Sequence, residues 1–481
     1  MFCSPSSPQG PLIHRLSLAI SKLAPKQWVG LLLGIAALLL GFAAPLTALP
    51  SPVQNALGIA LFALLFWTTE PIPIALSSVG VLALIPAVGL LDIEQSLAPF
   101  VSKTVWLVLA GMALSLGVAK TGLGDALASW LQSRLSQRPF LLLCQLHLIG
   151  LGTAFLIPSG VIRVLFLMPL GIALVERLHV HPSPHFKAAV LLSLLCSTYF
   201  GGCGLLTGSV PNLVLAGQYE KTQGAPIFWA TWLYWMFPVI GFLRTLVSLG
   251  AIWMLFGRHL DSHVIQRVPS PSSAPLTRVQ RRALYILLAG VGLWATDLLH
   301  HIQPAYVGLG LVALFLWPRW GLLHFGDLVK VRFALIAYIV ALLTLGYALD
   351  EAGFNHLFIA ACSEYLALEE YGWLGKHLSL CLVALPLDFL MDIAAVAGVA
   401  TIPLMELGAQ HGIAPLPAAF SVAMATTLAF LPYQSAPFMV AYGFRQLSMQ
   451  QLVLAQGLIS TASLVLLCPL NLLYWRWLGL I

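Results

Sequence analysis

Charged residues are scarce in this sequence of 481 residues, since Asp, Glu, Lys and Arg together make up only 8% of it. Soluble domains carry about 25% charged residues, so a soluble globular protein is excluded. Hydrophobic residues make up 59% of the chain and gather in long runs. Because a helix needs roughly 20 apolar residues to cross a bilayer, these runs predict an all-α polytopic membrane protein with about eleven transmembrane helices.

Motifs for nucleotide use, hydrolysis and metal binding are also absent. No Walker phosphate loop, HExxH or GxSxG pattern occurs, so we expect neither an ATP-driven pump nor an enzyme. The seven cysteines show no CxxC spacing and lie mostly within apolar runs, which indicates neither a disulfide framework nor a zinc site. The motif HVHPSPH (179–185) itself contains no acidic or cysteine residue, so we expect no metal site and no resident cofactor.

Positive charges outnumber negative ones, and the net charge of +6 is spread over loops. This dispersed charge therefore predicts no nucleic-acid partner. Its distribution indicates the orientation of the chain in the membrane instead. With a cytoplasmic N-terminus, 17 of the 23 lysines and arginines fall on the inner side, and the outer side receives Lys103, Lys221, Lys376 and Arg476. This bias predicts an integral protein of the cell membrane in which residues 1–52 hold a retained cytoplasmic N-terminus and the first transmembrane helix.

Two halves of the chain resemble each other on either side of a polar segment at 257–282, which is rich in proline and serine. The run at 106–123 aligns with the run at 337–354. We interpret 53–256 and 283–481 as repeats joined by a cytoplasmic linker. An odd number of crossings separates matching elements, so the repeats would be inverted in the membrane, as is typical of secondary transporters.

Four apolar segments are interrupted by proline, glycine or polar residues, two in each half: 155–163, 197–217, 385–399 and 430–443. Irregular backbone cannot face lipid, so it must be buried in protein or line a cavity. Broken helices at corresponding positions of two halves point to a transport site. Ordinary proline kinks packed against neighbouring helices are the alternative interpretation.

Three stretches carry a resemblance to a known family: TEPIPIALSSVGVLALIPAVGLL (69–91), GGCGLLTGSVPNLVLAG (201–217) and LPYQSAPFMVAYG (431–443). They resemble the opening segment and the two loops of the divalent anion:sodium symporter family, which carries dicarboxylates, citrate or sulfate. The residues that match in the two loops are Gly201, Gly202, Gly204, Gly208, Pro211, Asn212, Pro432 and Pro437, and Ser435 stands where the family has threonine.

The resemblance implies a scaffold domain that forms a homodimer and a transport domain that moves like an elevator. It places an inward re-entrant hairpin at about 139–178 and an outward one at about 376–411, with broken spans near 185–217 and 415–443. In the family each hairpin tip carries Ser-Asn-Thr, which binds sodium and the carboxylates of the substrate.

This sequence departs from the family at both tips. The matching positions hold Ser159-Gly160-Val161 in the first hairpin and Ile393-Ala394-Ala395 in the second. Sodium needs oxygen ligands, and of these six side chains only that of Ser159 offers one. We therefore expect a weakened sodium site in the first half, and the second-half sodium site is doubtful.

Arg163 lies in PSGVIR (158–163), which resembles the Pro-Ser-Asn-Thr-Ala-Arg of a sodium-independent branch of exchangers in the family. An arginine at the bilayer centre costs about 2.5–3.5 kcal/mol on insertion scales, so it needs a partner. We hypothesise that its guanidinium binds the anion and supplies the charge that sodium supplies in the symporters. The alternative is an ion pair with Asp388 or Asp392, and a buried Asp392 could also carry a proton. Arg244, the other arginine within an apolar run, is expected to snorkel or to pair within the scaffold, and a substrate role is the alternative.

The expected substrate-binding residues surround the first tip and the two loops: Ser159, Gly160, Arg163, Ser209, Pro211, Asn212, Ser435 and Pro437. Those expected to couple a cation or a proton are Ser159, Gly202, Thr207, Asn212, Asp388 and Asp392. Free backbone N–H groups at the tips would attract anions as well. The resulting hypothesis is a secondary active transporter of small divalent anions. An arsenite or other oxyanion permease of the same architecture and a transport-deficient sensor or structural homologue are the alternatives.

Overall fold

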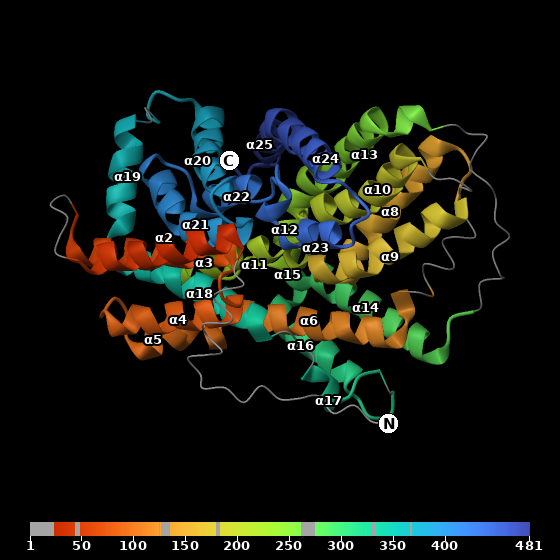
Figure 1. Ribbon diagram of the computed structural model, residues 1–481, viewed down its shortest axis with the longest axis horizontal. Helices are drawn as coiled ribbons and strands as arrows, with labels where there is room; N and C mark the ends of the chain where they lie inside the picture. Colours follow the sequence, from red (N-terminus) through yellow and green to blue (C-terminus); the bar gives the residue numbers. More distant parts are fainter. Residues whose placement is uncertain are drawn as a thin grey trace.

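The computed structural model describes residues 24–43, 49–124, 126, 135–178, 183–260, 275–320, 322–329, 333–365 and 368–481. The predicted N-terminal segment up to residue 23, linker residues 261–274 and the histidines at 179 and 181 lie outside the described residues. Within the described ranges the regular secondary structure is helical, without strands (Figure 1). Eight of these helices are long and apolar enough to cross a membrane, and three shorter apolar ones accompany them. The all-α polytopic fold is therefore confirmed.

The helices of the first half are α2 Pro25–Phe42, α3 Ser51–Thr69, α4 Ile74–Ala87, α5 Ile93–Leu97, η1 Ala98–Val101, α6 Lys103–Thr121, α8 Pro139–Leu156, α9 Gly160–Leu178, α10 Pro184–Gly202, η2 Leu206–Gly208, α11 Val210–Gln223, α12 Trp229–Met236, η3 Phe237–Leu243, α13 Arg244–Leu255 and η4 Gly257–His259. Those of the second half are α14 Arg278–Ala295, α15 Asp297–His300, α16 Pro304–Phe315, α17 Phe325–Leu328, α18 Phe333–Glu351, α19 Phe354–Tyr365, α20 Trp373–Asp388, α21 Ile393–Gln410, α22 Pro415–Ala425, η6 Pro432–Gln434, α23 Ala436–Gly443, α24 Met449–Ala462, η7 Ser463–Leu467 and α25 Cys468–Leu478.

The two halves repeat the same order of elements around their broken spans. In the first half α10, η2 and α11 follow the α8–α9 pair, and in the second half α22, η6 and α23 follow the α20–α21 pair. The short turns η2 and η6 begin at residues 206 and 432, and the π-helices η3 and η7 begin at 237 and 463. In each pair the second element begins 226 residues after the first. The internal repeat therefore includes the π-helix, which is a rare local structure. Inversion of the halves in the membrane stays a prediction.

The second piece of each broken span packs against a hairpin arm of the other half. Helix α11 lies along α21, and α23 lies along α9. Between α11 and α21, Gln218 Nε2 donates a hydrogen bond to the Gly398 carbonyl at 2.6 Å. At the start of α9 a Cβ on Gly160 would lie 3.0 Å from Cγ of Pro437. The halves therefore interlock at the places where their helices are interrupted.

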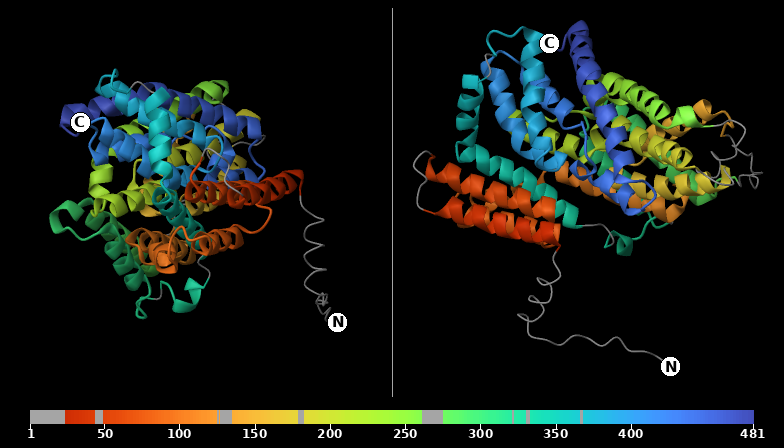
Figure 2. Two further views of the ribbon diagram at one scale, coloured as in Figure 1. Left: turned by 90° about the vertical axis from the view of Figure 1, so that its left-hand side faces the viewer. Right: turned by 45° about the horizontal axis from the view of Figure 1, so that its top comes forward.

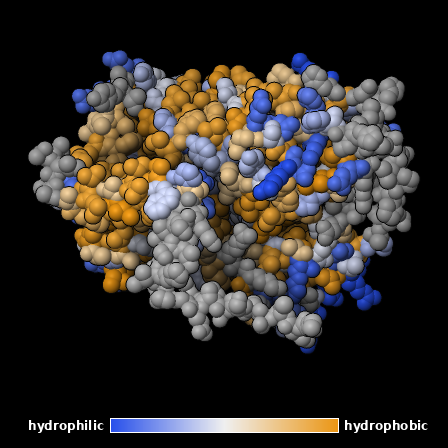
Figure 3. Space-filling model, viewed as in Figure 1, coloured by the Kyte–Doolittle hydropathy of each residue, from blue (hydrophilic) through white to orange (hydrophobic). Residues whose placement is uncertain are grey.

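Helices α2 and α3 form an antiparallel pair at the edge of the molecule (Figures 1 and 2). Glycine lets their backbones meet, since a Cβ on Gly41 would lie 2.8 Å from Cα of Gly58. Close approach at small residues is how membrane helices gain packing energy. The outer face of α2 exposes large apolar side chains such as Leu32 and Leu39. Figure 3 likewise shows apolar residues over most of the coloured area of one face, as expected of a surface in lipid.

Candidate functional site

Both hairpin tips and both broken-span loops line one small cavity of about 100 Å³. The first half contributes Ser159, Gly160, Val161, Tyr199, Gly208, Ser209, Val210 and Pro211. The second half contributes Leu335, Tyr338, Asp392, Ile393, Ala394, Gln434, Ser435, Ala436 and Pro437. Six of the residues expected from the sequence to bind substrate, and one further residue expected to carry a proton, meet here. The cavity therefore lies where the two halves interlock.

Four helices begin at this cavity. Helices α9, α11, α21 and α23 start at Gly160, Val210, Ile393 and Ala436, and each of these residues lines the cavity. The first N–H groups of a helix lack partners within it, and the N-terminus carries the equivalent of about half a positive charge. The ends of α9, α11 and α23 contribute a positive potential suited to a small anion, while the end of α21 is capped by Asp392.

Ser209 and Ser435 occupy equivalent places in the two loops, directly before α11 and α23. Their backbone angles nearly coincide, with φ −146° and ψ 140° for Ser209 and φ −147° and ψ 124° for Ser435. Neither side chain caps its helix, and Pro211 and Pro437 follow within the first turn. Proline is well tolerated there because its missing N–H would have no partner within the helix. The extended serine thus turns the chain so that each helix starts at the cavity.

Arg163 lies behind the cavity wall and is only 1% exposed. Its Nη1 donates to the Ile157 carbonyl at 2.9 Å, and its Nη2 donates to the carbonyls of Thr198 at 3.1 Å and Gly208 at 2.8 Å. These oxygens belong to the hairpin tip, the C-terminal part of α10 and the first loop. One guanidinium therefore holds three segments together, and its charge faces the negative end of the α10 dipole.

Neither partner considered for Arg163 from the sequence contacts it in this structure. The ion pairs among the described residues are Lys103–Glu220 and Lys120–Asp327, so neither Asp388 nor Asp392 is paired with Arg163. Nor does Arg163 line the cavity, although its neighbours Gly160 and Val161 do. Backbone carbonyls accept from Nη1 and Nη2 instead, and Nε has no hydrogen-bond partner among the described residues.

Glycine is required where the first loop returns to the end of α10. A Cβ on Gly208 would lie 2.1 Å from the Gly202 carbonyl oxygen, and a Cβ on Gly202 would lie 2.6 Å from Arg163 Nη2. Both distances are far inside van der Waals contact. A larger residue at either position would displace the loop or the arginine, so Gly202 acts here by leaving room for the guanidinium.

Thr207 and Asn212, both expected to couple a cation, do not line the cavity. Asn212 Nδ2 donates to the carbonyls of Cys203 at 2.9 Å and Leu205 at 2.8 Å. Thr207 Oγ1 accepts a hydrogen bond from Trp229 Nε1 at 3.1 Å. Both side chains thus hold the first loop in shape.

Gln434 holds the second loop. Its Oε1 accepts from the backbone N–H groups of Phe430 and Leu431, each at 2.7 Å, and its Nε2 donates to the Asp388 carbonyl at 2.6 Å. Gln434 lies 226 residues after Gly208, at the equivalent place of the other half. A neutral amide therefore ties the second loop to its hairpin, where the first half uses a cation.

Asp392 brings a negative charge to the cavity lining. Its Oδ1 accepts from the Ala394 N–H at 2.8 Å and from the Tyr338 hydroxyl at 3.2 Å. The carboxylate thereby caps α21 and occupies the helix end that a substrate carboxylate would otherwise meet. Asp388 is fully buried outside the lining, and its carboxylate oxygens have no hydrogen-bond partner among the described residues.

Three polar lining residues were missed from the sequence: Tyr199, Tyr338 and Gln434. Gln434 stands within the LPYQSAP motif, and its position beside two prolines was the available signal. Tyr199 and Tyr338 lie within helices α10 and α18. Tyrosine in an apolar run also marks membrane interfaces, so the residue type alone does not distinguish the two roles.

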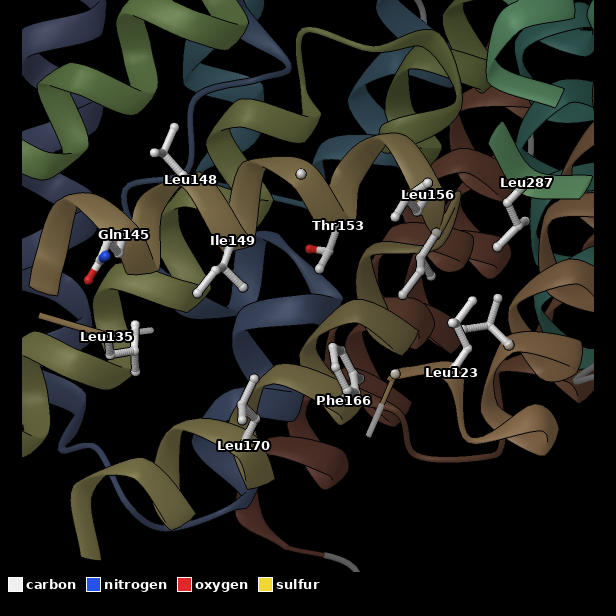
Figure 4. A pocket seen from close by; sticks show the side chains of 14 residues that line it. Leu123, Leu135, Gln145, Leu148, Ile149, Thr153, Leu156, Phe166, Leu170 and Leu287 are labelled. Carbon is white, nitrogen blue, oxygen red and sulfur yellow. The ribbon is translucent and has the colours of Figure 1, made fainter. Parts of the chain in front are cut away.

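A larger cavity of about 360 Å³ lies between the arms α8 and α9 of the first hairpin and is bounded by α6 and α14 (Figure 4). Leucine, isoleucine and phenylalanine side chains point into it, and Gln145 and Thr153 are its polar lining residues. Such walls suit an apolar ligand. Its size therefore does not make it the anion site.

Comparison with known proteins identifies the family of the chain. A model of the sodium:sulfate symporter transmembrane region matches residues 25–481. The chain belongs to the sodium:sulfate symporter family. The resemblance stated from the two loop motifs is confirmed, as is the expectation that the protein is a transporter and not an enzyme.

The chain is similar to sodium-dependent dicarboxylate transporters named SdcS. It is 24% identical over 445 residues to that of Staphylococcus saprophyticus, covering 85% of this chain and 84% of the relative. It is 25% identical over 253 residues to that of Staphylococcus aureus strain USA300, covering 50% and 47%. The crystal structure of the Alcanivorax borkumensis YdaH transporter matches with a TM-score of 0.54 at 14% identity, covering 89% of this chain and 99% of that one. That likeness supports the fold alone.

Proposed function

We propose that the protein carries small divalent anions across the cell membrane, as a sodium-independent exchanger of di- or tricarboxylates or of sulfate. The observation that carries this proposal is the cavity at which four helices begin, with Arg163 behind its wall. Helix N-termini and a buried guanidinium both attract negative charge. The anion would rest against the N–H groups of the tips and loops, beside Ser159, Ser209 and Ser435.

The size of the cavity favours a small solute. Pockets for drug-sized ligands measure roughly 300–1,000 Å³, and this one measures about 100 Å³. A dianion of few atoms, such as succinate or sulfate, suits this space. Because the similar SdcS proteins are dicarboxylate transporters, we place dicarboxylates first.

Sodium independence is supported by what already occupies the first loop. Hard cations bind where several oxygens converge, and the carbonyls of Ile157, Thr198 and Gly208 converge on the Arg163 guanidinium. The guanidinium then takes the place that a sodium ion would take. A sodium ion at Ser159 and Asn212, as in a symporter, is the alternative, and the sodium dependence of the SdcS relatives favours it.

An elevator-type movement fits the distribution of these elements. The hairpins and broken spans, α8–α13 and α20–α25, would move as a transport domain against a scaffold of α2–α6 and α14–α18. Tyr338 of α18 donates to Asp392 at the second tip, so this contact would break when the transport domain moves. The exposed apolar face of α2 belongs to the proposed scaffold, through which we expect a homodimer.

Uptake by liposomes tests the proposed function. Vesicles containing the purified protein are mixed with labelled succinate, citrate, 2-oxoglutarate or sulfate, with a sodium gradient, with a proton gradient, or after preloading with an unlabelled anion. We expect sodium-free uptake of a dicarboxylate that preloading stimulates. Steep dependence on sodium would contradict the proposal that the Arg163 guanidinium takes the place of a sodium ion. Flux of arsenite alone would favour the oxyanion permease, and absence of all flux would favour the transport-deficient homologue.

Asp392 should make uptake depend on pH. An ionised Asp392 repels an incoming anion, so protonation of its carboxyl should favour substrate binding. The groups close enough to influence it are Tyr338, Tyr199 and Asp388. We expect wild-type uptake to rise severalfold as pH falls on the side from which the anion enters. Asp392→Asn keeps an oxygen for the Ala394 N–H and should remove this dependence. An unchanged pH profile in this variant would exclude Asp392 as the titrating group.

A further inference from the structure

Arg244 is the second arginine buried in the apolar part of the chain, and it does not snorkel. Its side chain is 0% exposed, so the expectation that it snorkels is wrong. The residue begins α13 directly after the π-helix η3. A π-helix has more residues per turn than an α-helix and so changes the direction in which the following residues point. The 3.6-residue periodicity of an α-helix therefore does not predict in which direction the Arg244 side chain points.

The guanidinium of Arg244 meets the second broken span. Its Nη1 donates to the Thr427 carbonyl at 3.1 Å. Thr427 follows the end of α22 at Ala425, so the cation lies at the negative end of that helix. Arg163 likewise donates to a carbonyl near the end of α10, that of Thr198, which lies four residues before the last residue of that helix. Each broken span thus has a guanidinium at the C-terminal end of its first piece.

The helix that carries Arg244 also touches the first broken span. A Cβ on Gly204 of the first loop would lie 2.6 Å from Cα of Gly241 in η3. Cys203, the preceding residue, lies close enough to both Arg163 and Arg244 to interact electrostatically with each. The segment from η3 to Arg244 therefore bridges the two loops that meet at the anion cavity.

The charge of Arg244 is not balanced by a carboxylate in the described part of the chain, where both ion pairs involve lysines. Its Nε and Nη2 have no hydrogen-bond partner among the described residues. A buried charge without a partner costs several kcal/mol. Helix α22 supplies part of the compensation. Tyr199 of the cavity lining lies close enough to Arg244 to interact with it electrostatically, so an anion bound in the cavity would supply more.

We propose that Arg244 is a positioning residue that serves the second loop as a fixed cation, in the way that Arg163 serves the first. This inference rests on the proposed function. The two guanidinium groups give the anion site two permanent positive charges from its own chain. With Asp388 and Asp392 protonated, a doubly negative solute is then balanced without a cation from solution at either half.

Chemical rescue tests this role. Arg244→Ala is reconstituted in liposomes and compared with Arg138→Ala, which removes an exposed arginine at the base of the first hairpin. We expect sodium-free uptake by Arg244→Ala to fall at least tenfold, with a raised KM, and to recover in part when guanidinium chloride or sodium chloride is added. Arg138→Ala should behave as wild type under all three conditions.

Two conservative variants complete the test. Arg244→Lys keeps a positive charge that can reach a carbonyl, and Arg244→Gln keeps only a neutral amide. We expect the lysine variant to retain more sodium-free uptake than the glutamine variant. This comparison does not require that the alanine variant folds. Equal uptake by the two, or a loss in folded Arg244→Ala that neither cation relieves, would overturn the inference. Absence of anion uptake by the wild type would refute the proposed function itself.

Discussion

Arg163→Gln should reduce anion uptake to roughly 1% of wild type or less. The substitution removes a charge and all three hydrogen bonds to the carbonyls of Ile157, Thr198 and Gly208. Each hydrogen bond from a charged group contributes about 1.5–3 kcal/mol. If the substrate-binding conformation alone loses about 3 kcal/mol of stabilisation, uptake should fall roughly a hundredfold. Uptake of labelled succinate by liposomes without sodium measures this effect.

Arg138→Gln provides the matched control, since it removes an arginine from the exposed base of the same hairpin. We expect its uptake to stay within twofold of wild type. Uptake by Arg163→Lys should lie between the uptake of Arg163→Gln and that of Arg138→Gln. An ammonium keeps the charge but lacks the planar guanidinium that reaches three segments. Wild-type uptake by Arg163→Gln would show that the guanidinium neither holds the loop nor attracts the anion.

The sequence was informative wherever the backbone departs from a helix. Proline and glycine at 155–163, 197–217, 385–399 and 430–443 located the breaks between α8 and α9, α10 and α11, α20 and α21, and α22 and α23. These residues restrict the backbone by themselves, so their effect is local and visible in a single sequence. That the breaks should meet at one cavity followed from the matching order of the two halves.

The partners of the charged residues were not predictable in the same way. Arg163 and Arg244 donate to backbone carbonyls, and every residue has a carbonyl, so no residue type marks the acceptor. The burial of Arg244 depends on η3, whose wider turn has no sequence signature that we recognised. Tyr338 reaches Asp392 across 54 residues from a helix without interruption. Such contacts are set by tertiary packing.

Gly208→Ala should reduce uptake to near background while the protein remains folded. The added Cβ would lie 2.1 Å from the Gly202 carbonyl oxygen and 2.9 Å from its carbonyl carbon. Both atoms belong to the backbone, so they cannot rotate aside as a flexible side chain would. The loop must move, which draws the Gly208 carbonyl away from Arg163 Nη2 and shifts Ser209 and the start of α11 at the cavity.

Gly457→Ala is the matched control for this prediction, because a Cβ at Gly457 in α24 would meet nothing within 4 Å. Alanine is also the better helix former by about 1 kcal/mol, so this variant should be as stable as wild type or more so. Size-exclusion profiles in detergent and uptake in liposomes are measured for both variants. Near-background uptake by a monodisperse Gly208→Ala variant is the expected result. Wild-type uptake would mean that the loop yields without disturbing the cavity, and then the close approach of Gly202 and Gly208 would have no part in holding the anion site.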